Sequence, residues 1–269
     1  MTPHTSIVLV GGGNMGQALL RGWLADGRAA ESIHVVDPDA RARAAVGSMG
    51  ISSSSERPTS FGADVFVLAV KPHLVEGVLQ DYGDLADGQA TLLTIAAGKT
   101  IAFYQRLLGP GAAIVRGMPN TPAAIGKGIS ALAANEVVGS AQRRLCESLM
   151  AAVGQVVWLE DDGLMDSVTA VSGSGPAYVF LLIECLAAAA LKVGFEKELA
   201  ERLALATVAG AGAYAMASGA DPAELRRQVT SPGGTTQAAL EVLIGESQAL
   251  ESLLSEAVKA AAQRSRELA

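Results

Sequence analysis

The sequence has little of what marks a metal protein, a disulfide-stabilised scaffold or a nucleic-acid binder. Only two of its 269 residues are cysteine and three are histidine. Neither type shows zinc-ligand spacing or a C-x-x-C motif, so we predict no metal centre and no disulfide framework. Aromatic residues make up only 4% of the chain, and the formal net charge is -7 with no basic cluster. Nucleic acid and anionic membrane surfaces repel such a chain, so neither is an expected partner.

Long hydrophobic runs are also missing. The longest apolar stretch, Ala177 to Leu191, contains Glu184 and is shorter than a membrane span. The first apolar strand begins within a few residues of the N-terminus, which leaves no room for a signal peptide. We therefore expect a cytoplasmic protein. With 269 residues, 50% of them hydrophobic, the chain is long enough for two domains with packed cores.

The N-terminal segment has the pattern of a strand, a glycine turn and a helix. The apolar run Ser6 to Val10 is followed by Gly11-Gly12-Gly13-Asn14-Met15-Gly16, and helical spacing begins there. In a G-x-G-x-x-G motif, Gly11 permits the tight turn, Gly13 lets the backbone approach a pyrophosphate, and Gly16 lets the helix pack closely on the strand. A second strand, 32 to 36, ends in Asp37, where an acid reaches a ribose hydroxyl. This arrangement predicts dinucleotide binding.

Alternating strands and helices continue to about residue 161. Apolar runs predict strands at 64–70, 91–96, 113–116, 128–133 and 156–159, and helices are expected at 40–49, 74–82, 101–108 and 140–152. Ile51 starts a short strand or turn, and Ser52 to Ser55 is expected to be a polar loop. The fold class is therefore α/β, with an N-terminal Rossmann domain built on a doubly wound parallel sheet.

Beyond residue 161 the strand pattern disappears and Ala-rich helical spacing takes over. We predict two domains, 1–161 for NAD(P) binding and 162–269 as an all-helical domain. Helices this rich in alanine are not expected to bury their apolar faces alone, so a partner subunit is predicted.

Ligands bind such sheets outside the carboxyl ends of the strands. Three loops should converge there: 11–16, 69–72 and 118–121. Lys71 either contacts the cofactor or is a solvated lysine at a strand end. Asn120 either hydrogen-bonds the nicotinamide amide or caps its turn.

Two glycine-rich interruptions stand out in the helical half, SGSGPAY at 172–178 and TSPGGTTQ at 230–237. Glycines before a helix start form a concavity lined with N–H groups, where a substrate carboxylate could dock. The alternative is a pair of ordinary helix–helix turns with Ser and Thr caps.

With these stretches together, the sequence resembles the pyrroline-5-carboxylate reductases, which catalyse the last step of proline biosynthesis. The matching motifs are GGGNMG at 11–16, AVKP at 69–72, MPNTP at 118–122, SGSGPAY at 172–178 and VTSPGGTT at 229–236. The last two are specific to this family, whereas the first is shared by many dehydrogenases.

The resemblance implies an NADPH- or NADH-dependent reduction of the cyclic imine 1-pyrroline-5-carboxylate. It also implies a helical dimerisation domain, a homodimer, and a ring of dimers such as a decamer. The implied catalytic and substrate residues are Thr236, Ser231, Gly233, Gly234, Thr235 and Ser174, with the Thr236 hydroxyl near the ring nitrogen. The implied cofactor residues are Gly11, Gly13, Asn14, Met15, Gly16, Asp37, Pro38, Ala69, Val70, Lys71, Pro72, Met118 and Asn120.

Two positions depart from the family pattern. Asp37 stands where many members carry a small or neutral residue, and Glu56 stands where an asparagine is common. Both acids repel a 2'-phosphate, which favours NADH, but Arg41 and Arg43 are close enough in sequence to bind that phosphate. The preference between the two cofactors stays open at this point.

Two other functions are compatible with the architecture. A hydroxyacid-type dehydrogenase would need a lysine or histidine base in the helical half, where only Lys192, Lys197 and Lys259 occur. A non-catalytic nucleotide-sensing protein would bind the cofactor without oxidising it, and it would not need both glycine-rich motifs of the helical half.

Overall fold

The structure is a computed structural model that describes residues 5–58, 62–245 and 249–268. Its contacts divide the chain into two compact units, Met1–Ser174 with Ala261–Ala269, and Gly175–Ala260. The first unit thus continues past residue 161 and takes in the C-terminal residues. The domain boundary after residue 161 stays a prediction.

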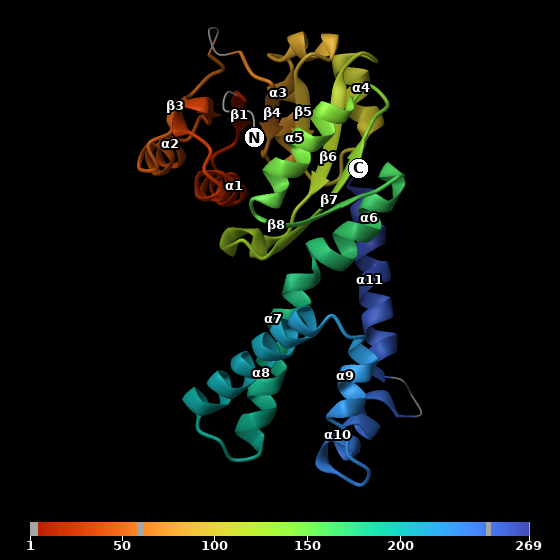
Figure 1. The fold of residues 1–269 in the computed structure, drawn as a ribbon. Helices are drawn as coiled ribbons and strands as arrows, with labels where there is room; N and C mark the ends of the chain where they lie inside the picture. Colours follow the sequence, from red (N-terminus) through yellow and green to blue (C-terminus); the bar gives the residue numbers. More distant parts are fainter. Residues whose placement is uncertain (1–4, 59–61, 246–248, 269) are drawn as a thin grey trace. The chain divides into compact units, whose positions relative to one another are not determined.

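An eight-stranded sheet forms the centre of the first unit, in the order β3-β2-β1-β4-β5-β6-β7-β8 (Figure 1). The strands are β1 (Ile7–Val10), β2 (Ile33–Val36), β3 (Ser52–Ser54), β4 (Val65–Leu68), β5 (Thr91–Thr94), β6 (Ala113–Met118), β7 (Gly128–Ala134) and β8 (Gly154–Trp158). Neighbouring strands are parallel except β6 and β7. The predicted doubly wound α/β fold is confirmed. The antiparallel pair was not expected, and it arises because β6 and β7 are joined by a short connection without a crossover helix.

The helices of this unit are short and flank the sheet. They are α1 (Asn14–Ala25), α2 (Ala40–Gly47), α3 (Val75–Leu79), α4 (Ile101–Leu108), α5 (Ser140–Ala151) and α6 (Met165–Val168). Short 3-10 segments include η1 (Ala30–Ser32), η2 (Pro72–Leu74), η3 (Gly83–Asp87), η4 (Thr121–Ile125) and η5 (Asp162–Leu164), and η6 (Thr169–Gly173) is a π-helix. The helix predicted at 74–82 is broken into η2, α3 and a turn.

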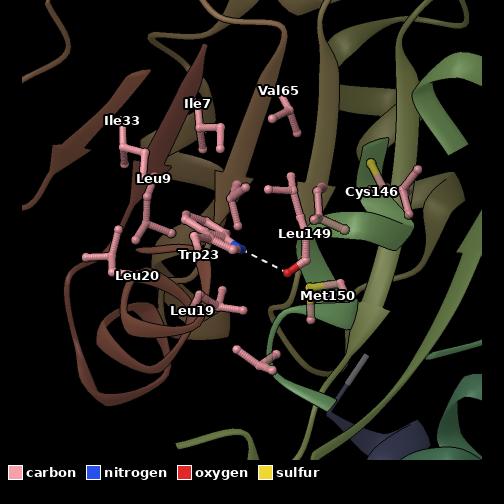
Figure 2. Packing of buried hydrophobic residues seen from close by; sticks show 14 of the residues in the cluster. Ile7, Leu9, Leu19, Leu20, Trp23, Ile33, Val65, Cys146, Leu149 and Met150 are labelled. Atoms are coloured by element: carbon pink, nitrogen blue, oxygen red, sulfur yellow. Dashed lines mark hydrogen bonds between the residues drawn. The ribbon is translucent and has the colours of Figure 1, made fainter. Parts of the chain in front are cut away.

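The two faces of the sheet carry separate cores because side chains alternate along each strand. Ile7 and Leu9 pack with α1, α2 and α5, while Val8 and Val10 pack with α3, α4 and α6. Figure 2 shows the first core, where the Trp23 Nε1 donates to the Leu149 carbonyl over 2.8 Å. Each large aliphatic side chain buried in this way contributes about 1.5–3 kcal/mol.

The predicted loop at Ser52 to Ser55 is wrong for its first three residues, which form the edge strand β3. This strand pairs in parallel with β2, from His34↔Ser52 to Val36↔Ser54. The His34 ring bridges the Ser52 and Ser54 hydroxyls at 2.9 and 2.8 Å. Backbone pairing and this imidazole bridge replace the hydrophobic pattern that normally marks a strand.

The second unit is helical. It contains α7 (Gly175–Lys192), α8 (Lys197–Ser218), α9 (Pro222–Gln228), α10 (Thr235–Ile244) and most of α11 (Ala249–Glu267). Figure 1 shows α7 and α8 running side by side, joined by a turn in which Gly194 has φ +104°. The Phe195 N–H donates to the Ala190 carbonyl over 3.2 Å and closes the C-terminus of α7.

The helices of this unit bury little of their apolar surface in the single chain. No residue of α7 or α10 is buried, and α8 buries only Ala200 and Ala204. The exposed large apolar residues include Val179, Phe180, Leu181, Leu182, Leu199, Leu203, Leu205, Val242, Leu243 and Ile244. Apolar surface of this extent marks an interaction site.

The helical run from Asp162 to Lys192 extends beyond the apolar stretch Ala177 to Leu191 on which the sequence-based expectation was based. It spans 31 residues, with a mean hydropathy of 1.7 in its most apolar window, and only 6% of that window is buried. Its length and composition alone would allow it to cross a membrane, so the expectation that this stretch is too short is corrected. The core helix of a soluble protein passes the same test, so this run alone does not identify a membrane span.

Candidate active site

The glycine turn lies where β1 ends beside β4. Gly11 has φ +104°, and a Cβ there would lie 2.5 Å from the Ala69 carbonyl oxygen. A Cβ on Gly16 would lie 2.1 Å from the Gly11 carbonyl oxygen. Only glycine fits these two positions, and the first helix therefore packs directly on the turn. Above Gly13 a Cβ would meet nothing within 4 Å, so the backbone there is open to a ligand.

The start of α1 follows this opening. Gly13 is the N-cap, and within the described ranges no side chain caps the helix start. The first-turn N–H groups, from Asn14 to Gly16, are therefore available to a phosphate, which the helix dipole also favours. Asn14 is exposed, while Met15 is half-buried and packs against the first core.

Asp37 fixes the middle of the glycine turn. Its Oδ2 accepts from the Gly12 N–H at 2.7 Å, and its Oδ1 accepts from the Asp39 N–H at 2.8 Å. On the other side, the Gln17 Nε2 donates to the Gly12 carbonyl over 2.9 Å. The carboxylate of Asp37 thus stands half-buried at the end of β2, next to the glycine turn, and Pro38 follows it on the surface.

The loop after β4 lies beside this turn. The Ala69 N–H donates to the Val10 carbonyl over 2.8 Å, which joins the ends of β1 and β4. Lys71 is exposed just before η2, which begins at Pro72. This placement suits either of the alternatives for Lys71, and the cofactor roles of Ala69, Val70, Lys71 and Pro72 stay predictions.

The loop after β6 is tied to the π-helix η6. The Asn120 Nδ2 donates to the Ser172 carbonyl at 3.1 Å, and its Oδ1 accepts from the Ile129 N–H at 3.0 Å. Asn120 precedes η4 but its side chain does not cap it, so the capping alternative is wrong. A Cβ on Gly173 would lie 2.8 Å from the Met118 Cε, so Met118 packs against bare backbone. The roles of Met118 and Asn120 toward the nicotinamide stay predictions.

The backbone of η6 bears the first half of the SGSGPAY motif. The Ser174 N–H donates to the Thr169 carbonyl over 2.8 Å, which is the wider hydrogen bond of a π-turn. Single π-turns occur frequently at functional sites. Ser174 is the last residue of the first unit at this point of the chain.

A buried ion pair near this loop was missed by the sequence analysis. Arg116, on β6, is 3% exposed, and its Nη1 lies 2.8 Å from the Asp162 Oδ1. The other oxygen of Asp162 accepts from the Ile101 N–H at 3.0 Å. The Tyr104 hydroxyl lies 2.7 Å from the Thr94 hydroxyl, and burial raises the pKa of Tyr104 to about 12. The only sequence signal was a charged residue at the end of the apolar run Ala113 to Val115.

In the helical unit, the TSPGGTT motif forms a turn that leads into α10. Gly233 has φ +69°, and the Gly234 N–H donates to the Ser231 carbonyl over 3.0 Å. Gly234 is the N-cap of α10, and a Cβ on it would lie 2.8 Å from the Ser231 Oγ. Thr235 and Thr236 occupy the first turn of the helix. The structure therefore brings five of the expected residues to one helix start, where backbone N–H groups favour an anion.

Among the described residues, no group of three or more His, Cys, Asp or Glu side chains is arranged to hold a metal ion. The two sites contain glycines, hydroxyls, an amide and one half-buried carboxylate. Such a set binds and orients ligands through backbone N–H groups.

The glycine turn and the sheet order define a dinucleotide-binding α/β protein with an added helical unit. The family model "Pyrroline-5-carboxylate reductase dimerisation" matches residues 162–268, and "NADP oxidoreductase coenzyme F420-dependent" matches residues 6–98. Over 98% of its length, the chain is 43% identical to a pyrroline-5-carboxylate reductase of Pseudomonas aeruginosa, 96% of which is covered. The chain belongs to the pyrroline-5-carboxylate reductase family.

Solved structures agree with this assignment. A pyrroline-5-carboxylate reductase from Coxiella burnetii superposes with a TM-score of 0.94 at 38% identity, covering 99% of both chains. The Plasmodium falciparum pyrroline carboxylate reductase, solved with NADP bound, gives a TM-score of 0.85 at 28% identity, covering 100% of this chain and 99% of that one.

Proposed function

We propose that this protein reduces the C=N bond of 1-pyrroline-5-carboxylate to give L-proline, with NADPH or NADH as the reductant. This reaction is the last step of proline biosynthesis. The observation that carries the substrate is the full-length match to pyrroline-5-carboxylate reductases, 43% identical over 98% of this chain. The glycine turn carries the cofactor, because Gly11 and Gly16 leave no room for side chains while the backbone at Gly13 is open. A pyrophosphate needs this combination of close packing below and open backbone above.

When bound, the reduced nicotinamide supplies a hydride to the imine carbon. The residues of the α/β unit hold the cofactor. The turn from Gly11 to Gly16 binds the pyrophosphate, Asp37 and Pro38 lie at the ribose, and the loops 69–72 and 118–120 hold the nicotinamide half.

The helical unit provides the site for the substrate carboxylate. The first-turn N–H groups of α10 and the Ser231 hydroxyl can donate to a carboxylate at the start of the helix. Gly233 and Gly234 keep this backbone uncovered, and an arginine is not needed for charge stabilisation. Thr235 supplies a further hydroxyl at the same helix start, and the role of Ser174, at the end of the first unit, stays a prediction.

Thr236 orients the ring nitrogen through its hydroxyl. A cyclic imine can arrive already protonated, so the reaction needs no strong acid, and the five matched motifs contain no His, Asp or Glu. Most of the rate enhancement then comes from holding imine and cofactor in a reactive orientation away from water. The rival dehydrogenase reaction would need a base, but Lys192, Lys197 and Lys259 are all exposed on helices.

We infer that the protein works as a homodimer in the cytoplasm, with higher assembly as a ring of dimers such as a decamer. The exposed apolar faces of α7, α8 and α10 support association through the helical unit. Both cysteines are free thiols, which is usual in a reducing compartment.

The test is the loss of reduced-cofactor absorbance with purified protein and 1-pyrroline-5-carboxylate, run in parallel with NADPH and NADH. Cofactor binding is measured separately by fluorescence. Substrate-dependent oxidation with either cofactor is the expected result. Binding without oxidation would overturn the reductase proposal in favour of nucleotide sensing.

A further inference from the structure

Asp37 stands at the end of β2, where an acid is expected to meet the adenosine ribose of the cofactor, and two hydrogen bonds hold its carboxylate in place. We propose that Asp37 makes this protein prefer NADH to NADPH. This inference rests on the proposed function, since it concerns the cofactor of the same site.

The carboxylate of Asp37 is held in place before any ligand binds. Each oxygen already accepts one backbone N–H, from Gly12 at 2.7 Å and from Asp39 at 2.8 Å. A carboxylate oxygen can accept more than one hydrogen bond, so both keep capacity for further donors. The hydroxyls of an unmodified adenosine ribose are such donors. A 2'-phosphate offers negative charge and acceptor oxygens instead, and it meets a fixed anion.

Asp37 cannot easily turn away from a phosphate. Turning it would leave the Gly12 N–H without its acceptor in the buried glycine turn, and an unsatisfied buried donor costs about 1–3 kcal/mol. The same turn forms the pyrophosphate site. Rejection of the 2'-phosphate is therefore tied to the geometry that binds the rest of the cofactor.

The nearest cation is engaged with the backbone. The Arg43 Nη1 donates to the carbonyls of Asp37 and Pro38, both at 2.8 Å, and so reinforces the turn that carries the carboxylate. The Ser54 hydroxyl, on the neighbouring strand β3, is bonded to the His34 ring and to the Glu56 carbonyl. Glu56 itself is exposed and adds a second negative charge after β3.

Arg41 is the remaining candidate for a phosphate contact. It is exposed in the first turn of α2, whose N-cap is Asp39. Its side chain would have to offset the carboxylates of Asp37, Asp39 and Glu56 around a 2'-phosphate. The local charge therefore favours the cofactor without that phosphate.

The first measurement is equilibrium binding of NADH and NADPH to the full-length oligomer by calorimetry. We expect NADH to bind at least about tenfold more tightly, a difference of about 1.4 kcal/mol. In competition with bound NADH, 5'-AMP should displace it better than 2',5'-ADP. Tighter binding of NADPH, or better displacement by 2',5'-ADP, would overturn the inference and leave the reductase proposal intact. Failure of both dinucleotides to bind would instead count against the proposed function.

Single substitutions test which residue sets the preference between NADH and NADPH. Asp37→Ser keeps an acceptor near Gly12 and removes the charge, so the ratio of the two dissociation constants should shift toward NADPH by about tenfold. The matched control Asp39→Ser removes the same charge two residues away and keeps a helix-capping side chain, and it should shift the ratio far less. An equal shift in both variants would contradict a specific role for Asp37. Arg41→Ala should leave NADPH binding unchanged, and a large loss would assign the phosphate to Arg41 and overturn the inference. If Asp37→Ser does not fold, the wild-type competition with the two nucleotides still decides.

Discussion

The Arg116 guanidinium donates to the Asp162 carboxylate over 2.8 Å, between residues that are 46 positions apart in the sequence. The second oxygen of the same carboxylate accepts from the Ile101 N–H at 3.0 Å, at the start of α4. One side chain therefore connects the end of β6, the start of α4 and the start of the helical run at 162. The side chains are 4% and 21% exposed, so water screens the pair weakly.

Arg116→Met should lower the free energy of unfolding by about 3 kcal/mol, because it leaves Asp162 without its cation in a mostly buried position. Urea denaturation followed by circular dichroism measures this. The double variant Arg116→Met with Asp162→Asn should recover part of the loss. Strictly additive losses would show that the two side chains are not coupled.

Trp23→Phe should destabilise the protein by about 2 kcal/mol, because it leaves the buried Leu149 carbonyl without its donor and a small void beside it. Trp158→Phe is the matched control, since the Trp158 Nε1 bonds the exposed Glu147 carboxylate at 3.2 Å. Its effect should be under about 1 kcal/mol. Equal losses in thermal denaturation would contradict the packing in the first core.

Asn120→Ala should lower the free energy of unfolding by about 1–3 kcal/mol, because the Ser172 carbonyl and the Ile129 N–H both lose their partner. The unfolding midpoint in urea reports this directly. Cofactor affinity, measured on the same variant, separates the two roles of the side chain. Unchanged stability with weakened cofactor binding would mean that Asn120 acts only on the nicotinamide.

Thr236→Ala should lower turnover by about 10- to 100-fold at saturating substrate, because the ring nitrogen loses the hydroxyl that orients it. Thr236→Ser keeps the hydroxyl and should retain most of the activity. The dissociation constant of the reduced cofactor should be unchanged in both variants. Wild-type turnover in Thr236→Ala would remove this residue from the catalytic set.

Arg57 donates to both carboxylate oxygens of Asp84 in η3, and acid should weaken this contact. Hydrogen bonding to Arg57 holds the pKa of Asp84 below its ordinary value of 3.8. A carboxyl whose pKa is lower in the folded state stabilises the fold above its unfolded value and loses that contribution as pH falls through the folded value. Unfolding measured between pH 7 and 2.5 should therefore show a smaller acid-induced loss in Asp84→Asn than in wild type. Asp81→Asn is the control, because Arg57 bonds only the backbone carbonyl of Asp81. If the two variants show the same acid profile, the ionic contact is not responsible.

The sequence predicted the main strands and the glycine turn because these depend on local patterns. The apolar run before Gly11 and the fully apolar segment 65–68 predict buried parallel strands whatever lies elsewhere. Gly233 and Gly234 before a helical pattern also indicated a helix start, but the sequence placed it at Ala238, whereas α10 begins at Thr235. In these segments, neighbouring residues alone determine the structure.

Other features depend on residues that are distant in sequence. Ser52 to Ser54 form a strand only because β2 offers a pairing edge and His34 bridges two of the hydroxyls. The sequence alone does not identify the partner of Arg116 or the hydrogen bond between Asn120 and Ser172. Asp37 accepts from the Gly12 N–H and is also expected to contact the ribose. The first of these roles could not be predicted without the geometry of the turn.

Because the apolar faces of α7, α8 and α10 are exposed in the single chain, the stability of the protein should depend on its concentration as well as on its sequence. If a second copy covers them, as proposed above, it adds a free energy that depends on protein concentration through mass action. The midpoint of thermal unfolding should then rise with protein concentration, and dilution alone should destabilise the helical unit. If the chains associate as proposed, newly made chains carry this uncovered surface until they meet each other, and the rate of synthesis influences how many reach the assembled state.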